Sequence, residues 1–149
     1  PNHLDVHKDM DEYVDAKKNI FRFQDSCGKL IVNADNAITD AFEGNGETYK
    51  FSRKMPTNGV WECDGVIFRG DKPVLNVADI LLPGVHNIEN YMTAIALTYG
   101  IAENDAVTRV AKTFGGVEHR NEFVREVDGV KYYNSSIDSS PKSRRSPKI

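Results

Sequence analysis

Two carboxamides and an imidazole lie close together at the start of one predicted helix. Gly84 follows an apolar, strand-like run and Gly100 stands where a helix would end, so the segment between them is predicted to be helical. At about 100° per residue, His86, Asn87 and Asn90 share an arc that begins in the first turn, where backbone N–H groups lack partners and the helix dipole is positive. Such side chains can hydrogen-bond a heterocycle or lie near a phosphate. An asparagine cap beside a satisfied histidine is the alternative interpretation.

A lysine interrupts the apolar face of a second helix, near the start of the chain. Asp9 and Glu12 resemble a capping box, which opens a helix that runs to about Gln24. The apolar positions of this helix are Met10, Tyr13, Val14, Ile20 and Phe21. Lys17 takes the place on the same face where the next apolar residue belongs, and burial there disfavours an ammonium group. Either the side chain extends past its neighbours to solvent, or the amine is kept neutral and takes part in chemistry.

Two further motifs lie near the ends of the chain, and each alone indicates little. His3 belongs to Asn2-His3-Leu4-Asp5, which looks like a loop between a strand and a helix whose strand is missing. We therefore expect the 149 residues to be a piece of a longer protein. His119-Arg120 lies in a short polar connector after Gly115-Gly116. A loop histidine and a surface arginine are the alternatives to a functional role for these residues.

The elements that must position these residues alternate between strands and helices. A buried strand is predicted at 29–35, a short helix at 37–42, and further strands at 48–52, 60–63, 66–69 and 74–77. Asp64-Gly65 indicates a hairpin, and Asn104 is predicted to cap a helix that ends at Gly115-Gly116. Strands at 123–126 and 130–133 form a second hairpin around Asp128-Gly129. This mixture predicts an α/β or α+β fold with antiparallel strands at one edge of the sheet.

Composition and charge exclude several classes of protein. Hydrophobic residues make up 40% of the chain and charged residues 28%, as in soluble globular domains. No apolar run reaches the roughly 18 residues of a membrane helix. Four of the 19 basic residues lie in residues 141–149, whereas all 22 acidic residues precede them. An acidic body argues against nucleic acid as the main partner, and the two cysteines, which form no metal-binding pattern, suit the cytoplasm.

The four motifs, in this order and at this spacing, resemble the Mur ligase family, the ATP-dependent ligases of peptidoglycan precursors. The resemblance covers most of residues 1–137 and is densest in 86–97 and 113–133. It implies an incomplete central ATP-binding domain over 1–118, made of a sheet with flanking helices and antiparallel edge strands. Residues 119–138 would then be a hinge and the first hairpin of a C-terminal Rossmann-like domain. Residues 139–149 are predicted to be a basic, poorly ordered tail.

The resemblance assigns a role to each candidate residue. His3 matches the family's magnesium-binding histidine, although Asn2 replaces the usual acid before it. Lys17 matches a lysine that becomes carbamylated and then ligates the metal as a carboxylate, and oxygen ligands suit Mg²⁺.

On the nucleotide side, Asn87 and Asn90 match asparagines that contact the adenine of ATP, and His86 belongs to the same motif. Arg120 matches an arginine that faces the ATP phosphates across the hinge, where its planar fork can bind two oxygens. Lys17 and Arg120 are therefore the candidate catalytic residues, and ATP and Mg²⁺ the implied cofactors.

Within the family, the chain is most similar to the members that join D-glutamate to UDP-N-acetylmuramoyl-L-alanine through an acyl phosphate. Another Mur ligase or a folylpolyglutamate-type ligase is the first alternative. A non-catalytic, degenerate fragment is the second, because Ser135 stands where the family has an aspartate that binds the ribose. The family's glycine-rich phosphate loop is absent from residues 1–149, so we expect no turnover from this chain alone. The implied location is the cytoplasm, with no nucleic-acid or membrane partner.

Overall fold

The computed structural model describes residues 7–120 and 122–136. It begins with helix α1, Met10–Arg22, which forms as the sequence predicts. The carboxylate of Asp9 accepts a hydrogen bond from the Glu12 N–H at 2.9 Å, which is the N-cap interaction. The Glu12 carboxylate accepts a hydrogen bond from the Lys8 N–H at 2.8 Å. In a capping box it would accept from the N–H of the N-cap residue, Asp9, so here the second bond reaches one residue further back.

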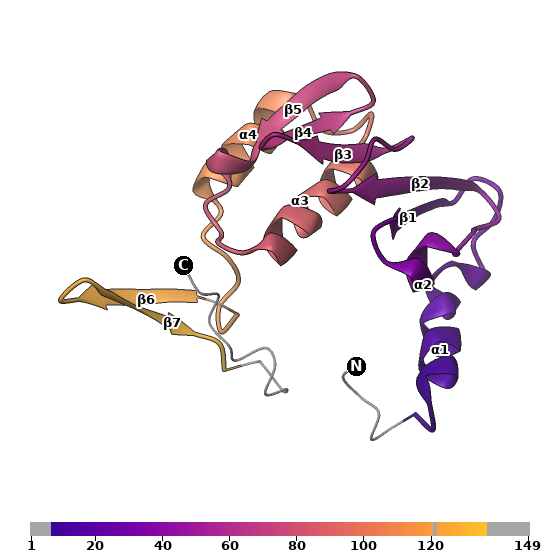
Figure 1. The fold of residues 1–149 in the computed structure, drawn as a ribbon, viewed down its shortest axis with the longest axis horizontal. Helices are drawn as coiled ribbons and strands as arrows, with labels where there is room; N and C mark the ends of the chain where they lie inside the picture. Colours follow the sequence, from indigo (N-terminus) through magenta and orange to yellow (C-terminus); the bar gives the residue numbers. More distant parts are fainter. Residues whose placement is uncertain (1–6, 121, 137–149) are drawn as a thin grey trace.

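Five strands form one mixed sheet in the order β1-β2-β3-β4-β5. Their bounds are Lys29–Asn33, Glu47–Ser52, Val60–Cys63, Val66–Arg69 and Lys72–Asn76. The first three strands are parallel, and β4 and β5 continue the sheet as antiparallel strands. This confirms the predicted α/β sheet with antiparallel strands at one edge (Figure 1).

The predicted turn at Asp64-Gly65 joins β3 to β4. Both residues have positive φ, 50° and 76°, which is the backbone of a type I′ turn. A second turn, at Gly70, was not predicted: Gly70 has a φ of 55° and lets β5 begin at Lys72, two residues before the predicted start. Pro73 fits this strand because β5 is the sheet edge.

Helix α3 (Val85–Leu97) covers one face of the parallel part of the sheet, and on the other face α2 (Ala37–Asp40) and the end of α1 pack against β1. The remaining elements are the 3-10 turn η1 (Val77–Asp79) and α4 (Asn104–Thr113). On β1, Leu30 and Val32 pack with Phe21 of α1, whereas the intervening Ile31 packs against the larger core beneath α3. Successive residues of a strand point to opposite faces, so β1 contributes side chains to the hydrophobic cluster on each face of the sheet.

The larger core is built on α3. Met92 and Ile95 are fully buried against Phe51, Val60 and Ile67 of the sheet. Tyr99 lies two residues beyond the end of α3 at Leu97 and is 54% exposed. The cap of α4 is also displaced by one residue: Glu103 is the N-cap and Asn104 the first helical residue.

The last two strands form the predicted second hairpin. Strands β6 (Glu122–Val127) and β7 (Val130–Asn134) pair only with each other, around a turn in which Asp128 and Gly129 have φ of 50° and 79°. The hairpin extends away from the five-stranded sheet (Figure 1). No helix among the described residues is long and apolar enough to cross a membrane.

Candidate functional site

The first turn of α3 is shaped by a glycine and closed by an asparagine. Gly84, the N-cap, has a φ of 102°, and a Cβ at this position would lie 2.8 Å from the imidazole Cε1 of His86. The His86 ring therefore folds back over Gly84, where only a glycine fits. Gly84 has no side chain to cap the helix, and Asn87 Nδ2 donates to the Pro83 carbonyl at 2.7 Å, which ties the first turn to the residue before the cap.

The two asparagines of α3 form one pair. Asn90 Nδ2 donates to Asn87 Oδ1 at 3.4 Å, across one helical turn. Asn90 is exposed, and its Oδ1 has no hydrogen-bond partner in the described part of the chain. One amide is therefore held by the backbone, while the outer amide still offers an acceptor to a ligand.

Asn87 and Asn90 help to line an open cavity of about 260 Å³ between α3 and α4. Its lining consists of Leu82, Asn87, Asn90, Tyr91, Ala94, Val110 and Phe114. Apolar walls with a few polar groups at one side are typical of sites for a flat heterocycle. His86 does not line this cavity, so the structure brings together two of the three residues of the predicted arc.

Tyr91 is a residue of this cavity that the sequence pattern did not single out. Its hydroxyl is buried and has no hydrogen-bond partner among the described residues, and burial raises its pKa. The sequence offered one signal for this residue: Tyr91 lies one helical turn after Asn87 on the same predicted helix. Val110 of α4 and Phe114, the residue after that helix, also line the cavity.

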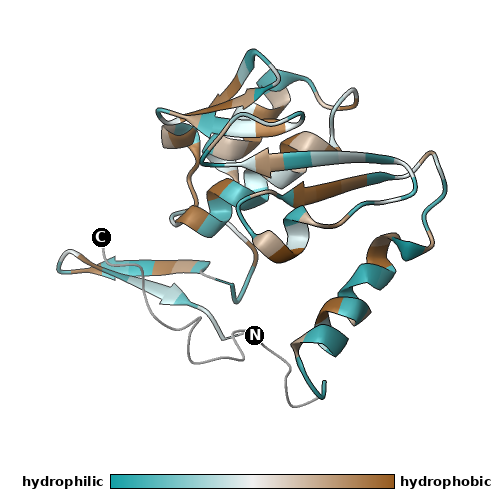
Figure 2. Cartoon of the chain, turned by 45° about the vertical axis from the view of Figure 1, so that its right-hand side comes forward, coloured by the Kyte–Doolittle hydropathy of each residue, from teal (hydrophilic) through white to brown (hydrophobic). Residues whose placement is uncertain are grey.

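Of the two interpretations of Lys17, the structure agrees with the one in which its side chain reaches solvent. Lys17 is exposed, and its ammonium lies 5.4 Å from the centre of the Tyr13 ring, a cation–π distance. The physical reason is that α1 buries only Phe21, while Ile20 on the same face is 80% exposed. The side chain thus follows the alternative in which it reaches solvent. Figure 2 shows α1 with a mainly hydrophilic surface interrupted by apolar positions.

The magnesium site is not formed by the residues that the structure describes. His3 lies outside the described residues, and within them no three His, Cys, Asp or Glu side chains gather into a group that could hold a metal ion. The described part of the chain therefore does not fit Mg²⁺ by itself, and no step of the chemistry is assigned to the ion.

Arg120 lies in a tight turn beside the cavity wall. Its N–H donates to the Val117 carbonyl at 3.0 Å, which closes the turn. At Gly116, which precedes the turn and has a φ of 107°, a Cβ would lie 3.2 Å from Leu82 Cδ2 and 3.7 Å from the Arg120 carbonyl oxygen. Leu82 lines the cavity, so the turn that carries Arg120 passes directly next to it.

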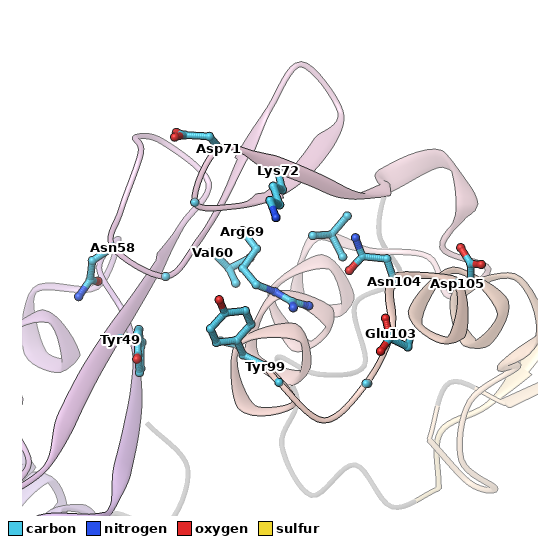
Figure 3. A pocket seen from close by; sticks show the side chains of 16 residues that line it. Tyr49, Asn58, Val60, Arg69, Asp71, Lys72, Tyr99, Glu103, Asn104 and Asp105 are labelled. Carbon is cyan, nitrogen blue, oxygen red and sulfur yellow. The ribbon is translucent and has the colours of Figure 1, made fainter.

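A larger cavity, of about 730 Å³, lies at the other end of α3 (Figure 3). Arg69 stacks over the Tyr99 ring at 4.9 Å, and its Nε and Nη2 atoms have no partner among the described residues. Figure 3 shows Lys72 directed toward the same space. The lining also holds Asp71, Glu103 and Asp105, which offset the two cations, and none of the predicted site residues.

Comparisons with known proteins agree with the resemblance seen in the sequence. The model of the Mur ligase middle domain matches residues 1–98. A UDP-N-acetylmuramoylalanine–D-glutamate ligase of Clostridium beijerinckii is 50% identical over 144 residues, which is 95% of this chain and 31% of the relative.

The ligase of the same name from Acetivibrio thermocellus is 49% identical over 148 residues, 95% of this chain and 32% of the relative. The chain thus spans about a third of the length of the curated relatives it matches. With this sheet, its flanking helices and a family match over two thirds of its residues, the chain belongs to the Mur ligase family.

Proposed function

We propose that this chain serves in the ATP-dependent joining of D-glutamate to UDP-N-acetylmuramoyl-L-alanine, a step of peptidoglycan synthesis in the cytoplasm. The observation that carries the proposal is the cavity between α3 and α4, lined in part by Asn87 and Asn90, in a chain about half identical to ligases of that name. The cavity supplies apolar contact for a flat base and two amides for its polar edge.

The proposed chemistry is activation of the substrate carboxylate by ATP to an acyl phosphate, followed by attack of the D-glutamate amine. An amide bond forms, and ADP and phosphate leave. In this proposal the described residues bind and orient ATP. Asn87 and Asn90 hold the base, and the Arg120 guanidinium faces the phosphates across the hinge. A planar fork suits phosphoryl oxygens, and correct placement supplies much of the rate of such reactions.

We further propose the division of the chain that goes with this function. Residues 1–118 belong to the nucleotide-binding domain and 119–138 to the hinge and the beginning of the next domain. The separation of the β6–β7 hairpin from the main sheet supports this division.

The proposed carbamylation of Lys17, with His3 and Mg²⁺, rests on the resemblance, and the exposure of Lys17 does not favour it. Carbamylation requires a neutral amine, and the described chain does not bury this one. Intact mass measurement decides the point: a carbamate adds the mass of CO₂ at Lys17, whereas an unmodified lysine leaves the mass unchanged.

A degenerate, non-catalytic role is the second candidate, because Ser135 stands where the family has its ribose-binding aspartate. ADP release in the presence of UDP-N-acetylmuramoyl-L-alanine separates the two. The product of the complete gene should release ADP with D-glutamate and not with other amino acids. A preference for another amino acid would indicate a different ligase of the family, and no release with any would favour the degenerate role. The 149-residue chain itself should show no turnover, because it lacks the phosphate loop.

A further inference from the structure

The turn that carries Arg120 contains a histidine in a conformation that favours glycine. The Arg120 N–H bonds the Val117 carbonyl, so residues 117–120 form a β-turn with His119 as its third residue. His119 has a φ of 66°. Turns with a positive φ at the third position normally have glycine or asparagine there. A non-glycine residue in this region persists only where its surroundings hold it, and such residues are frequent at functional sites.

Glu122 holds the backbone of His119. The His119 N–H donates to Glu122 Oε2 at 3.0 Å, a bond between a backbone donor and a carboxylate. Glu122 is the first residue of β6, so the bond joins the turn to the start of the hairpin.

Asn134, on the opposite strand, contacts both the Glu122 carboxylate and the His119 ring. It is directly across from Glu122 in the β6–β7 pairing. Its Nδ2 lies 3.2 Å from Glu122 Oε2 and 2.9 Å from Nδ1 of the His119 ring. The Asn134 Oδ1 accepts from the Ser136 N–H at 3.2 Å, so both ends of the amide are engaged and its orientation is fixed.

We propose that Glu122 and Asn134 are positioning residues. By holding His119 in its left-handed conformation, they set the orientation of Arg120, the next residue of the turn. Arg120 is the residue after His119, and a change of φ at His119 would redirect everything that follows it. The same turn begins beside Leu82, which lines the cavity between α3 and α4. The geometry of the turn therefore places the arginine relative to the proposed nucleotide site. The role of Arg120 in this inference rests on the proposed function. The part that concerns the conformation of His119 rests on the hydrogen bonds alone.

The test uses NMR on the 149-residue chain and three single variants. A residue with positive φ has a short distance between its own amide proton and Hα, and therefore a strong NOE between them. This NOE should be strong for His119 in the parent chain, persist in Glu122→Gln, which keeps an acceptor oxygen, and be lost in Glu122→Ala and Asn134→Ala. Glu126→Ala, which removes an exposed carboxylate from the same strand β6, is the matched control and should keep the NOE. Unchanged methyl signals of Met92 and Ile67 show that each variant is folded.

The second readout is the shift of the Arg120 Nε–Hε signal on addition of ATP, with the Asn90 side-chain amide as an independent reporter. In Glu122→Ala we expect the ATP affinity reported by Arg120 to fall about tenfold, the size of one charge-assisted hydrogen bond. Glu122→Gln should retain most of it. A His119 NOE that persists in both alanine variants overturns the inference, as does an unchanged Arg120 response after the NOE is lost. If ATP moves neither Asn90 nor Arg120 in the parent chain, the proposed function fails, and the NOE alone then decides whether Glu122 and Asn134 hold the turn.

Discussion

Helices α1 and α3 are both 13 residues long and both carry predicted site residues, yet α3 is packed into the main core whereas α1 is anchored through a single buried residue. Helix α3 buries Met92, Ile95 and Ala96 in the main core, and its asparagines lie at a formed cavity. Helix α1 buries Phe21 alone, and Lys17 lies in solvent. A side chain does precise chemistry only if packing fixes the element that carries it, so among the described elements we expect α3, and not α1, to hold its candidate site residues in a fixed geometry.

The largest test of this contrast compares a buried apolar residue of α3 with an exposed apolar residue of α1. Met92→Ala in α3 should lower the free energy of unfolding by about 3 kcal/mol, because Met92 is fully buried and a cavity would remain. Ile20→Ala in α1 should change it by less than about 0.5 kcal/mol, because Ile20 is 80% exposed. Urea denaturation followed by far-UV circular dichroism measures both. Equal losses would mean that α1 is packed as firmly as α3.

A smaller effect is expected at the two ends of α3. Gly84→Ala should cost about 1–2 kcal/mol, because φ is 102° and the new Cβ would press against the His86 ring. Gly100→Ala is the matched control, since its φ is 79° and no atom lies within 4 Å of the added Cβ. Its cost should be the smaller of the two in thermal or urea unfolding. The reverse order would show that the contact with His86 does not constrain the helix start.

Tyr91 tests whether the cavity wall carries a buried polar group. Burial raises the Tyr91 pKa, so the folded state keeps the phenol proton at a pH where the unfolded chain, with a pKa of about 10, has lost it. Stability from this group is therefore present below about pH 10 and decreases as the pH rises above it.

Tyr91→Phe should remove that decrease and, at neutral pH, change stability by less than about 1 kcal/mol, in the stabilising direction, because the hydroxyl has no partner among the described residues. The measurement is urea unfolding of the two chains at neutral and alkaline pH. An identical pH dependence in both would place the hydroxyl in water.

The smallest effect concerns the two exposed cysteines, one after α1 and one in the sheet. A hydrogen bond from the Cys63 thiol to the Asp64 carboxylate, together with that charge, raises the Cys63 pKa and slows its reaction. Asp64→Asn should speed alkylation of Cys63 by iodoacetamide at pH 8, while the rate at Cys27 stays the same. Asparagine also tolerates the positive φ of 50° at this turn. A rate at Cys63 that does not change would remove Asp64 as the cause.

Much of the fold could be predicted from local sequence, because the decisive signals are local. Asp64-Gly65 and Asp128-Gly129 specify turns with positive φ, and both hairpins form around them. Helical spacing alone placed Asn87 and Asn90 on one arc of α3, and in the structure their side chains are within hydrogen-bond distance of each other.

Features that depend on distant parts of the chain could not be predicted in the same way. An apolar face on α1 predicted burial around Lys17, but burial requires a partner surface, which helical periodicity does not supply. The unpartnered hydroxyl of Tyr91 depends on how α3 packs against its neighbours. The left-handed His119 goes against local preference and is held by residues 3 and 15 positions further along the chain.

The most direct test of the central claim, that the α3–α4 cavity binds the base of ATP, is an NMR titration of the 149-residue chain with ATP. The side-chain amide signals of Asn87 and Asn90 and the ring signals of Phe114 should shift together and saturate with one weak affinity. Signals of Lys17, and of Arg69 at the far end of α3, should stay in place. Shifts at Arg69 without shifts at the two asparagines, or no shift at the asparagines at millimolar ATP, would contradict the claim.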